Sequence, residues 1–257
     1  MAEIHEALGD VLTLLGDYRG ALAHLETASA LAGPEREAAI EHRLGLVLAR
    51  SGDWARAERH LTAALESVGP DGDPTIRSRI LADRSAIAQR SGDLDRADLL
   101  AAEALAIAAA AGDGSGVARA EDLLGIVARS RGDLVGAGRH LERAIAAVDL
   151  AEAAARPDVK IDPGIRVAAL NTLALISADE GDRDRAMALT REALTRCELQ
   201  GDRHRQAALE NNLADLLQAT GHGDEAMVHL KRAVGLFAEV GGRPAELEPE
   251  IWKLVEW

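Results

Sequence analysis

The sequence predicts an all-α protein, a right-handed α-solenoid of about six helical hairpins followed by a C-terminal helix. Ala makes up about a fifth of the 257 residues and aromatic residues only 2%, a composition that favours helices over sheets. A Gly-Asp pair, once Gly-His, recurs along the chain at intervals of 36, 40, 40, 49 and 40 residues. Ala also recurs five and twelve residues after each of these glycines, so that two small side chains lie two helical turns apart on one face.

The recurring glycines predict the turn inside each hairpin. Gly adopts the left-handed conformation that ends many helices without steric cost, and the Asp after it accepts hydrogen bonds from the first free N–H groups of the next helix. Each unit therefore reads as two antiparallel helices of about 14 residues. The six turns are expected at Gly16, Gly52, Gly92, Gly132, Gly181 and Gly221.

Small residues also mark the first helix of each unit. A Leu-Gly or Leu-Ala pair stands eight and seven residues before the turn glycine in five units, and the third unit has Arg84-Ser85 instead. Small side chains allow neighbouring helices to approach closely. A single hairpin cannot bury its apolar face, so stacking of the units must form the core.

The spacing predicts a repeat array over residues 1–240, an insertion at 149–166 and a C-terminal capping segment at 241–257. The insertion contains Pro157, Pro163 and Gly164 and is expected to be a surface loop, with a binding element or a hinge as the alternative. The capping segment ends in an apolar stretch with Trp252 and Trp257, which could instead be a docking surface for another subunit. The first helix begins at Met1 without a polar capping unit, so we expect either a longer parent protein or a partner that covers this face.

These repeated positions resemble the tetratricopeptide repeat (TPR), whose Leu-Gly, Ala, apolar and Ala positions match in almost every unit over residues 2–240. Leu or Ala replaces most aromatic residues of the family pattern, and the period is nearer 40 than 34 residues. The longer form is similar to arrays in bacterial signal-transduction ATPases and their transcription regulators. The resemblance implies a protein- or peptide-binding module, as the sensor or scaffold part of a larger regulator beside an ATPase or effector domain.

The chemistry of the chain argues against several other functions. A net charge of −14 disfavours direct binding to nucleic acid, and no stretch is apolar enough to span a membrane. Cys197 is the single cysteine, which excludes a disulfide framework and fits a reducing, cytoplasmic location. We find no phosphate loop, zinc helix or nucleophile elbow, so we expect neither an enzyme nor a cofactor.

Four histidines share one repeat position, eight residues after the turn glycine: His24, His60, His140 and His229. They belong to different repeats, which are too far apart to share a metal ion. We therefore interpret them as packing or hydrogen-bonding residues of the second helix, and we expect no metal site.

The resemblance places the first helices of the hairpins on the concave face, where five arginines would converge. Arg suits carboxylates, and Asn171 and Asn211 match the family positions that hold the backbone of an extended peptide. We expect a peptide, possibly acidic, to bind there, with pairing of the arginines to nearby acids as the alternative. Structural self-association through the first helix or the Trp252–Trp257 end is the other candidate function, and the oligomeric state is left open. The expected binding residues are His42, Arg50, Arg79, Arg90, Arg119, Arg129, Asn171, Asn211, Asp215 and Gln218.

Overall fold

The computed structural model describes residues 1–153 and 164–239, and within them it consists of α-helices with one short 3-10 helix (η1, Pro34–Arg36). The helices are α1 (Ala2–Leu15), α2 (Tyr18–Leu31), α3 (Glu37–Arg50), α4 (Trp54–Val68), α5 (Pro74–Arg90), α6 (Leu94–Ala111), α7 (Gly114–Ser130), α8 (Leu134–Ala153), α9 (Gly164–Asp179), α10 (Arg183–Gln200), α11 (Arg203–Ala219) and α12 (Gly223–Glu239). The prediction of an all-α solenoid built from helical hairpins is confirmed. Several helices are longer than the predicted 14 residues, up to 20 in α8.

The turns have the predicted chemistry. All six turn glycines have φ between 81° and 87°, a conformation that costs other residues more than Gly. The side chain of Asp53 accepts a hydrogen bond from the backbone N–H of Arg56 at the start of α4, and Asp93 does the same for Arg96 at the start of α6. The turn signal therefore sets where each hairpin reverses.

Within the first, second and fourth hairpins, a glycine of the odd-numbered helix faces a leucine side chain of the even-numbered helix. A Cβ atom at Gly45 would lie 2.7 Å from Cγ of Leu61, and Gly9 faces Leu25 in the same way. In the third hairpin Ser85 replaces the glycine, and its hydroxyl donates to the carbonyl oxygen of Ala97 at 2.7 Å. The residue corresponding to Leu61 is there the smaller Ala101. The irregular third unit thus keeps the close helix approach with a different pair of residues.

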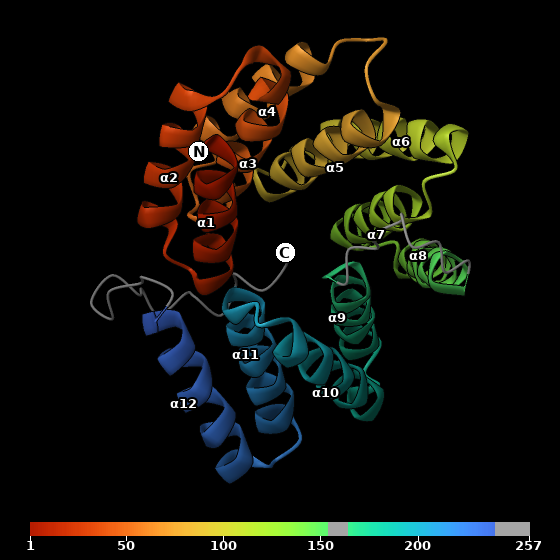
Figure 1. The fold of residues 1–257 in the computed structure, drawn as a ribbon. Helices are drawn as coiled ribbons and strands as arrows, with labels where there is room; N and C mark the ends of the chain where they lie inside the picture. Colours follow the sequence, from red (N-terminus) through yellow and green to blue (C-terminus); the bar gives the residue numbers. More distant parts are fainter. Residues whose placement is uncertain (154–163, 240–257) are drawn as a thin grey trace.

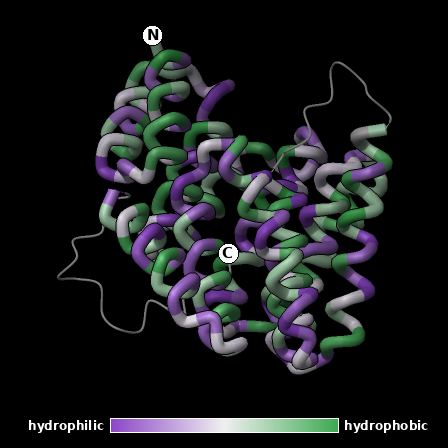
Figure 2. Tube along the Cα trace, turned by 90° about the horizontal axis from the view of Figure 1, so that it is seen from below, coloured by the Kyte–Doolittle hydropathy of each residue, from purple (hydrophilic) through white to green (hydrophobic). Residues whose placement is uncertain are grey.

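The hairpins curve into a nearly closed ring. The odd-numbered helices lie toward the centre and the even-numbered helices around the outside (Figure 1). Hydrophobic and hydrophilic segments alternate along the helices, as expected when each helix buries part of its surface (Figure 2). The first hairpin reaches the last one, since Tyr18 of α2 and His204 of α11 share a hydrogen bond of 2.8 Å across 186 residues of sequence.

The described residues include only the ends of the predicted insertion. Residues 149–153 continue α8, and Gly164 begins α9, so these parts of the expected loop are helical. Residues 154–163 and the predicted capping segment 241–257, with Trp252 and Trp257, lie outside the described residues. Among the described helices, none is long and apolar enough to cross a membrane.

Candidate binding site on the inner face

The ring surrounds a cavity of about 740 Å³, a volume within the range of ligand sites. Its wall comes from α1, α3, α5, α7 and α11, with contributions from α4 and α12. Apolar lining residues include Leu46, Trp54, Ile87 and Phe237. The charged lining residues are Asp10, Arg43, Arg50, Asp83, Arg90, Arg119 and Arg205.

The arginines of the cavity wall are held by partners. Arg50 donates to Asp202 at 2.9 Å, and Arg205 lies 3.6 Å from the same carboxylate. Arg119 pairs with Asp83, and the guanidinium of Arg90 stacks 5.2 Å from the ring centre of Trp54. These contacts fix the arginine heads in place, so a carboxylate ligand would meet ordered donors rather than flexible ones.

The contacts of Arg50 and Tyr18 also close the ring. Asp202 lies 152 residues from Arg50 in sequence and caps α11. The ring of His204 packs edge-on against Phe237 of α12. Burial raises the pKa of Tyr18 to about 12, and burial together with the nearby Arg50 lowers the pKa of His204 to about 4. His204 is therefore neutral at pH 7 and can share its hydrogen bond with the Tyr18 hydroxyl without a charge.

Polar pairs connect successive inner helices at one repeat position. The residue ten before a turn glycine meets the residue nine before the next turn glycine: His42 contacts Asp83 at 2.6 Å, and Asn212 donates to Asn171 at 2.9 Å. Burial alone would raise the pKa of Asp83, but Arg119 and His42 lower it to about 2. Asp83 therefore stays ionised. It connects α5 to α3 through His42 and to α7 through Arg119.

Two polar atoms of this series lack hydrogen-bond partners among the described residues. They are Oδ1 of Asp122 and Nδ2 of Asn211, and both residues are buried. Burial raises the pKa of Asp122 to about 7, although Arg119 and Arg205 act in the opposite direction. An inner helix thus carries a carboxyl group that is partly protonated at neutral pH.

The expected binding residues divide into four groups. Arg50, Arg90 and Arg119 lie on the cavity wall. His42, Asn171 and Asn211 are buried between helices, contrary to the expectation that these side chains face an open groove. His42 pairs with Asp83, and Asn171 accepts a hydrogen bond from Asn212. Arg79, Asp215 and Gln218 are exposed outside the cavity lining, and Arg129 pairs with Asp179 at 2.7 Å. The role of all these residues in binding stays a prediction.

Sequence reasoning missed Arg43, Arg205, Trp54 and Phe237, all of which line the cavity. Arg43 lies four residues after Ala39 and three before Leu46, so strict helical spacing along the inner face would have included it. Trp54 and Phe237 lie at the ends of outer helices. Trp54 packs at the junction between the second and third hairpins, whereas Phe237 reaches the cavity because the array curves, which no local pattern encodes.

The four repeated histidines have the hydrogen-bonding role that we expected. His60 contacts Glu41 and His140 contacts Glu121, each at 2.7 Å, and each pair connects the two helices of one hairpin. His229 contacts Glu210 in the last hairpin, and His24 contacts His5 in the first. Within residues 1–153 and 164–239, no three His, Cys, Asp or Glu side chains are grouped so as to hold a metal ion.

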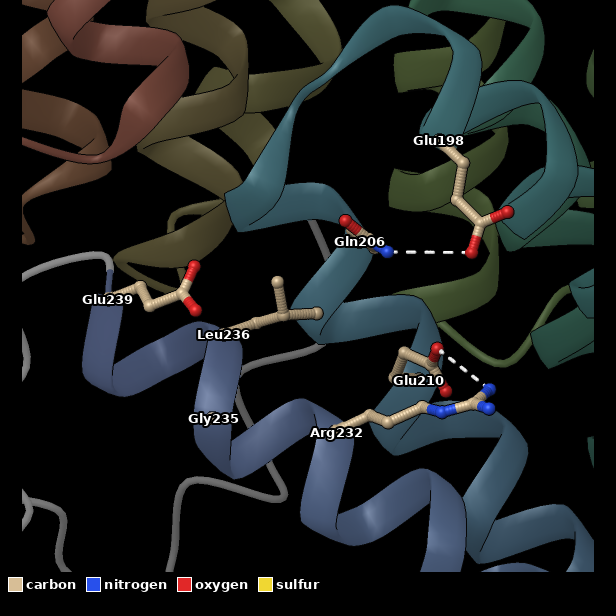
Figure 3. A pocket seen from close by; sticks show the side chains of 7 residues that line it. All are labelled: Glu198, Gln206, Glu210, Arg232, Gly235, Leu236 and Glu239. Carbon is tan, nitrogen blue, oxygen red and sulfur yellow. Dashed lines mark hydrogen bonds and ion pairs between the residues drawn. The ribbon is translucent and has the colours of Figure 1, made fainter.

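A second cavity, of about 350 Å³, lies between α10, α11 and α12 (Figure 3). Its polar side chains are already paired: Gln206 donates to Glu198 at 3.4 Å, and Arg232 lies 3.8 Å from Glu210. Three glutamates and one arginine line it. It is therefore a poorer site for a carboxylate than the central cavity, which has more arginines than acids.

Comparisons with known proteins agree with the fold. Residues 1–69 match the family model described as "Tetratricopeptide repeat", and no curated protein matches the sequence. BtubC from P. vanneervenii aligns at 19% identity over 89% of this chain and 91% of its own, with a TM-score of 0.56. A Rap protein complexed with competence and sporulation factor aligns at 15% identity over 90% of this chain, with a TM-score of 0.71, and this chain spans 66% of it. The apo form of RapI aligns at 11% identity over 93% of this chain and 98% of its own, with a TM-score of 0.60.

Proposed function

Since the chain is a helical array of tetratricopeptide-repeat type, we propose that it is a non-enzymatic module that binds a protein segment or peptide in its central cavity. Repeats of this type generally mediate protein–protein interaction. The cavity carries the proposal, because five arginines from α3, α5, α7 and α11 converge in it beside several large apolar side chains. A Rap protein of similar fold is complexed with competence and sporulation factor, which supports a ligand-binding role for such an array.

The chemistry of the wall indicates the kind of ligand. Ordered guanidinium groups bind carboxylates in bidentate geometry, and Trp54, Ile87 and Phe237 offer apolar surface beside them. The ligand is therefore a segment that combines acidic and apolar side chains. Because acids already pair with several of the arginines, we expect moderate affinity, with ligand carboxylates competing for or sharing these donors.

The test compares two arginine variants on an array of immobilised peptides of varied acidity and hydrophobicity. Arg90→Glu places a negative charge on the cavity wall and is expected to abolish binding to the acidic, apolar peptides that the unaltered protein selects. Arg59→Glu is the matched control, because Arg59 is exposed on the outer helix α4 and lies outside the cavity lining. Loss of binding in Arg90→Glu alone supports the proposal.

Binding of the same peptides by Arg90→Glu and by the unaltered protein would contradict the proposal. Thermal unfolding of both variants checks that a loss of binding is not a loss of fold. The role as the sensor or scaffold part of a larger bacterial regulator stays a prediction from the resemblance.

A further inference from the structure

Helix α1 leaves uncovered a face that the other inner helices bury. Ile4, Leu8 and Val11, which stand twelve, eight and five residues before the turn glycine, have exposed fractions of 56%, 42% and 52%. The corresponding residues of α3, which are Ile40, Leu44 and Val47, are buried against the preceding hairpin. This apolar face of α1, hereafter the head face, therefore lacks the neighbour that the same positions have elsewhere.

Helix α12 has exposed apolar residues at positions where the preceding outer helix, α10, packs against the next hairpin. Met227 and Val234, six and thirteen residues after the turn glycine, have exposed fractions of 50% and 46%. The corresponding residues of α10, Met187 and Leu194, are each 8% exposed because α11 covers them. Met227 and Val234 form what we call the tail face.

The junctions inside the array show how a head face and a tail face fit together. The position six after a turn glycine meets the position eight before the next one, as in the ion pair of Glu58 with Arg84 at 2.8 Å. The same two positions hold apolar residues, Leu22 and Leu44, in the junction before it. Thus Arg84, which breaks the Leu pattern of the other units, is matched by an acid on its neighbour.

The same register matches the two free faces with each other. In this register Met227 faces Leu8, and Val234 faces Ile4. Inside the array, Leu194 and Leu209 hold the positions that correspond to Val234 and Ile4, and they pack in one core cluster. Both pairs are apolar, so joining them leaves no charge unmatched at these positions.

We propose that two copies of this chain associate head to tail, with the tail face of one copy packed on the head face of the other. The second copy is the occupant that fits, because it carries the complementary face in the register of the internal junctions and so continues an interface that the array already uses. A contact between two different faces leaves one head and one tail free in each complex, so association can extend beyond a dimer.

The test uses the full chain and sedimentation velocity over a wide concentration range. The unaltered protein is expected to form larger species as concentration rises. Leu8→Glu disables the head face and Met227→Glu the tail face, so each variant alone is expected to sediment as a monomer. An equimolar mixture of the two is expected to form a one-to-one dimer that grows no further, because the intact tail of the first variant binds the intact head of the second.

Leu199→Glu is the matched control, because Leu199 is 87% exposed on α10 and belongs to neither face, and this variant is expected to associate like the unaltered protein. Thermal unfolding checks each variant, and Val11→Glu serves as a second head variant. The proposal would be overturned if the unaltered protein stayed monomeric, or if the mixture of the two variants stayed monomeric. It would also be overturned if Met227→Glu alone self-associated, as a two-fold packing of α1 on α1 would allow.

Discussion

Asp122 shows how one buried residue sets the response of the protein to pH. Its Oδ1 lacks a hydrogen bond within the described residues, and burial raises its pKa to about 7 even with Arg119 and Arg205 nearby. The folded state therefore binds more protons than the unfolded chain between about pH 4 and pH 7. The contribution of Asp122 to stability is greatest below this window and is lost as the pH rises through it.

We predict that Asp122→Asn stabilises the protein at high pH. The amide is neutral at every pH, so the variant avoids the cost of ionising the buried carboxyl group. The free energy of unfolding should exceed that of the unaltered protein by about 2–4 kcal/mol at pH 8 and differ little at pH 4. Urea unfolding at several pH values measures it. The exposed Asp71 gives the control Asp71→Asn, and a less stable Asp122→Asn at pH 8 would show the account of Asp122 to be wrong.

The residues that line the cavity could be predicted from the sequence only in part. The arginines at positions 50, 90 and 119 follow from their place on the first helix of each unit, and they do line the cavity. The sequence pattern could not show that Asn171 is enclosed by Asn212 of the next inner helix. Whether such a side chain is exposed depends on how neighbouring repeats pack together. The sequence pattern within one repeat carries no information on that packing.

At the scale of the hairpin, the Gly–Leu contact fixes how closely two helices approach. The glycine of the first helix leaves room for Leu25 in the first hairpin and for Leu61 in the second. The turn glycines and these small residues were readable from the sequence because each acts within a single hairpin. The helix lengths were underestimated, since the extra residues of the longer repeats extend the helices as well as the loops.

We predict that Gly45→Ala destabilises the protein although Ala favours helices. The new Cβ would lie 2.7 Å from two carbon atoms of Leu61 and 3.3 Å from the backbone oxygen of Ala57, and such overpacking costs about 1–3 kcal/mol. Gly138→Ala, also inside a helix, meets no atom within 4 Å and should gain about 0.5–1 kcal/mol. Chemical unfolding of both variants measures the difference, and equal stabilisation by both would contradict the role of the Gly–Leu contact.

At the scale of the whole molecule, closure of the ring creates the cavity. The contacts of Tyr18 with His204 and of Arg50 with Asp202 join residues 186 and 152 positions apart. Such contacts depend on the small rotation between repeats, summed over the array, and the sequence pattern carries no measure of that rotation. For this reason the closure, and the cavity residues that it brings in from α11 and α12, could not be predicted from the repeats.

The most direct test that the chain forms a ring around its cavity is a distance measured between the first and the last hairpin. Spin labels would be attached to Arg19→Cys and Ala238→Cys, which are exposed positions. The native Cys197 resists labelling, because it is buried and burial raises the pKa of its thiol to about 12. We predict a single short, narrow distance distribution by pulsed electron paramagnetic resonance. Tyr18→Phe, which removes the hydrogen bond to His204, should broaden it, whereas Thr27→Val, which removes an exposed bond within α2, should not. A long, broad distribution in the protein with an intact Tyr18 would contradict the closed ring.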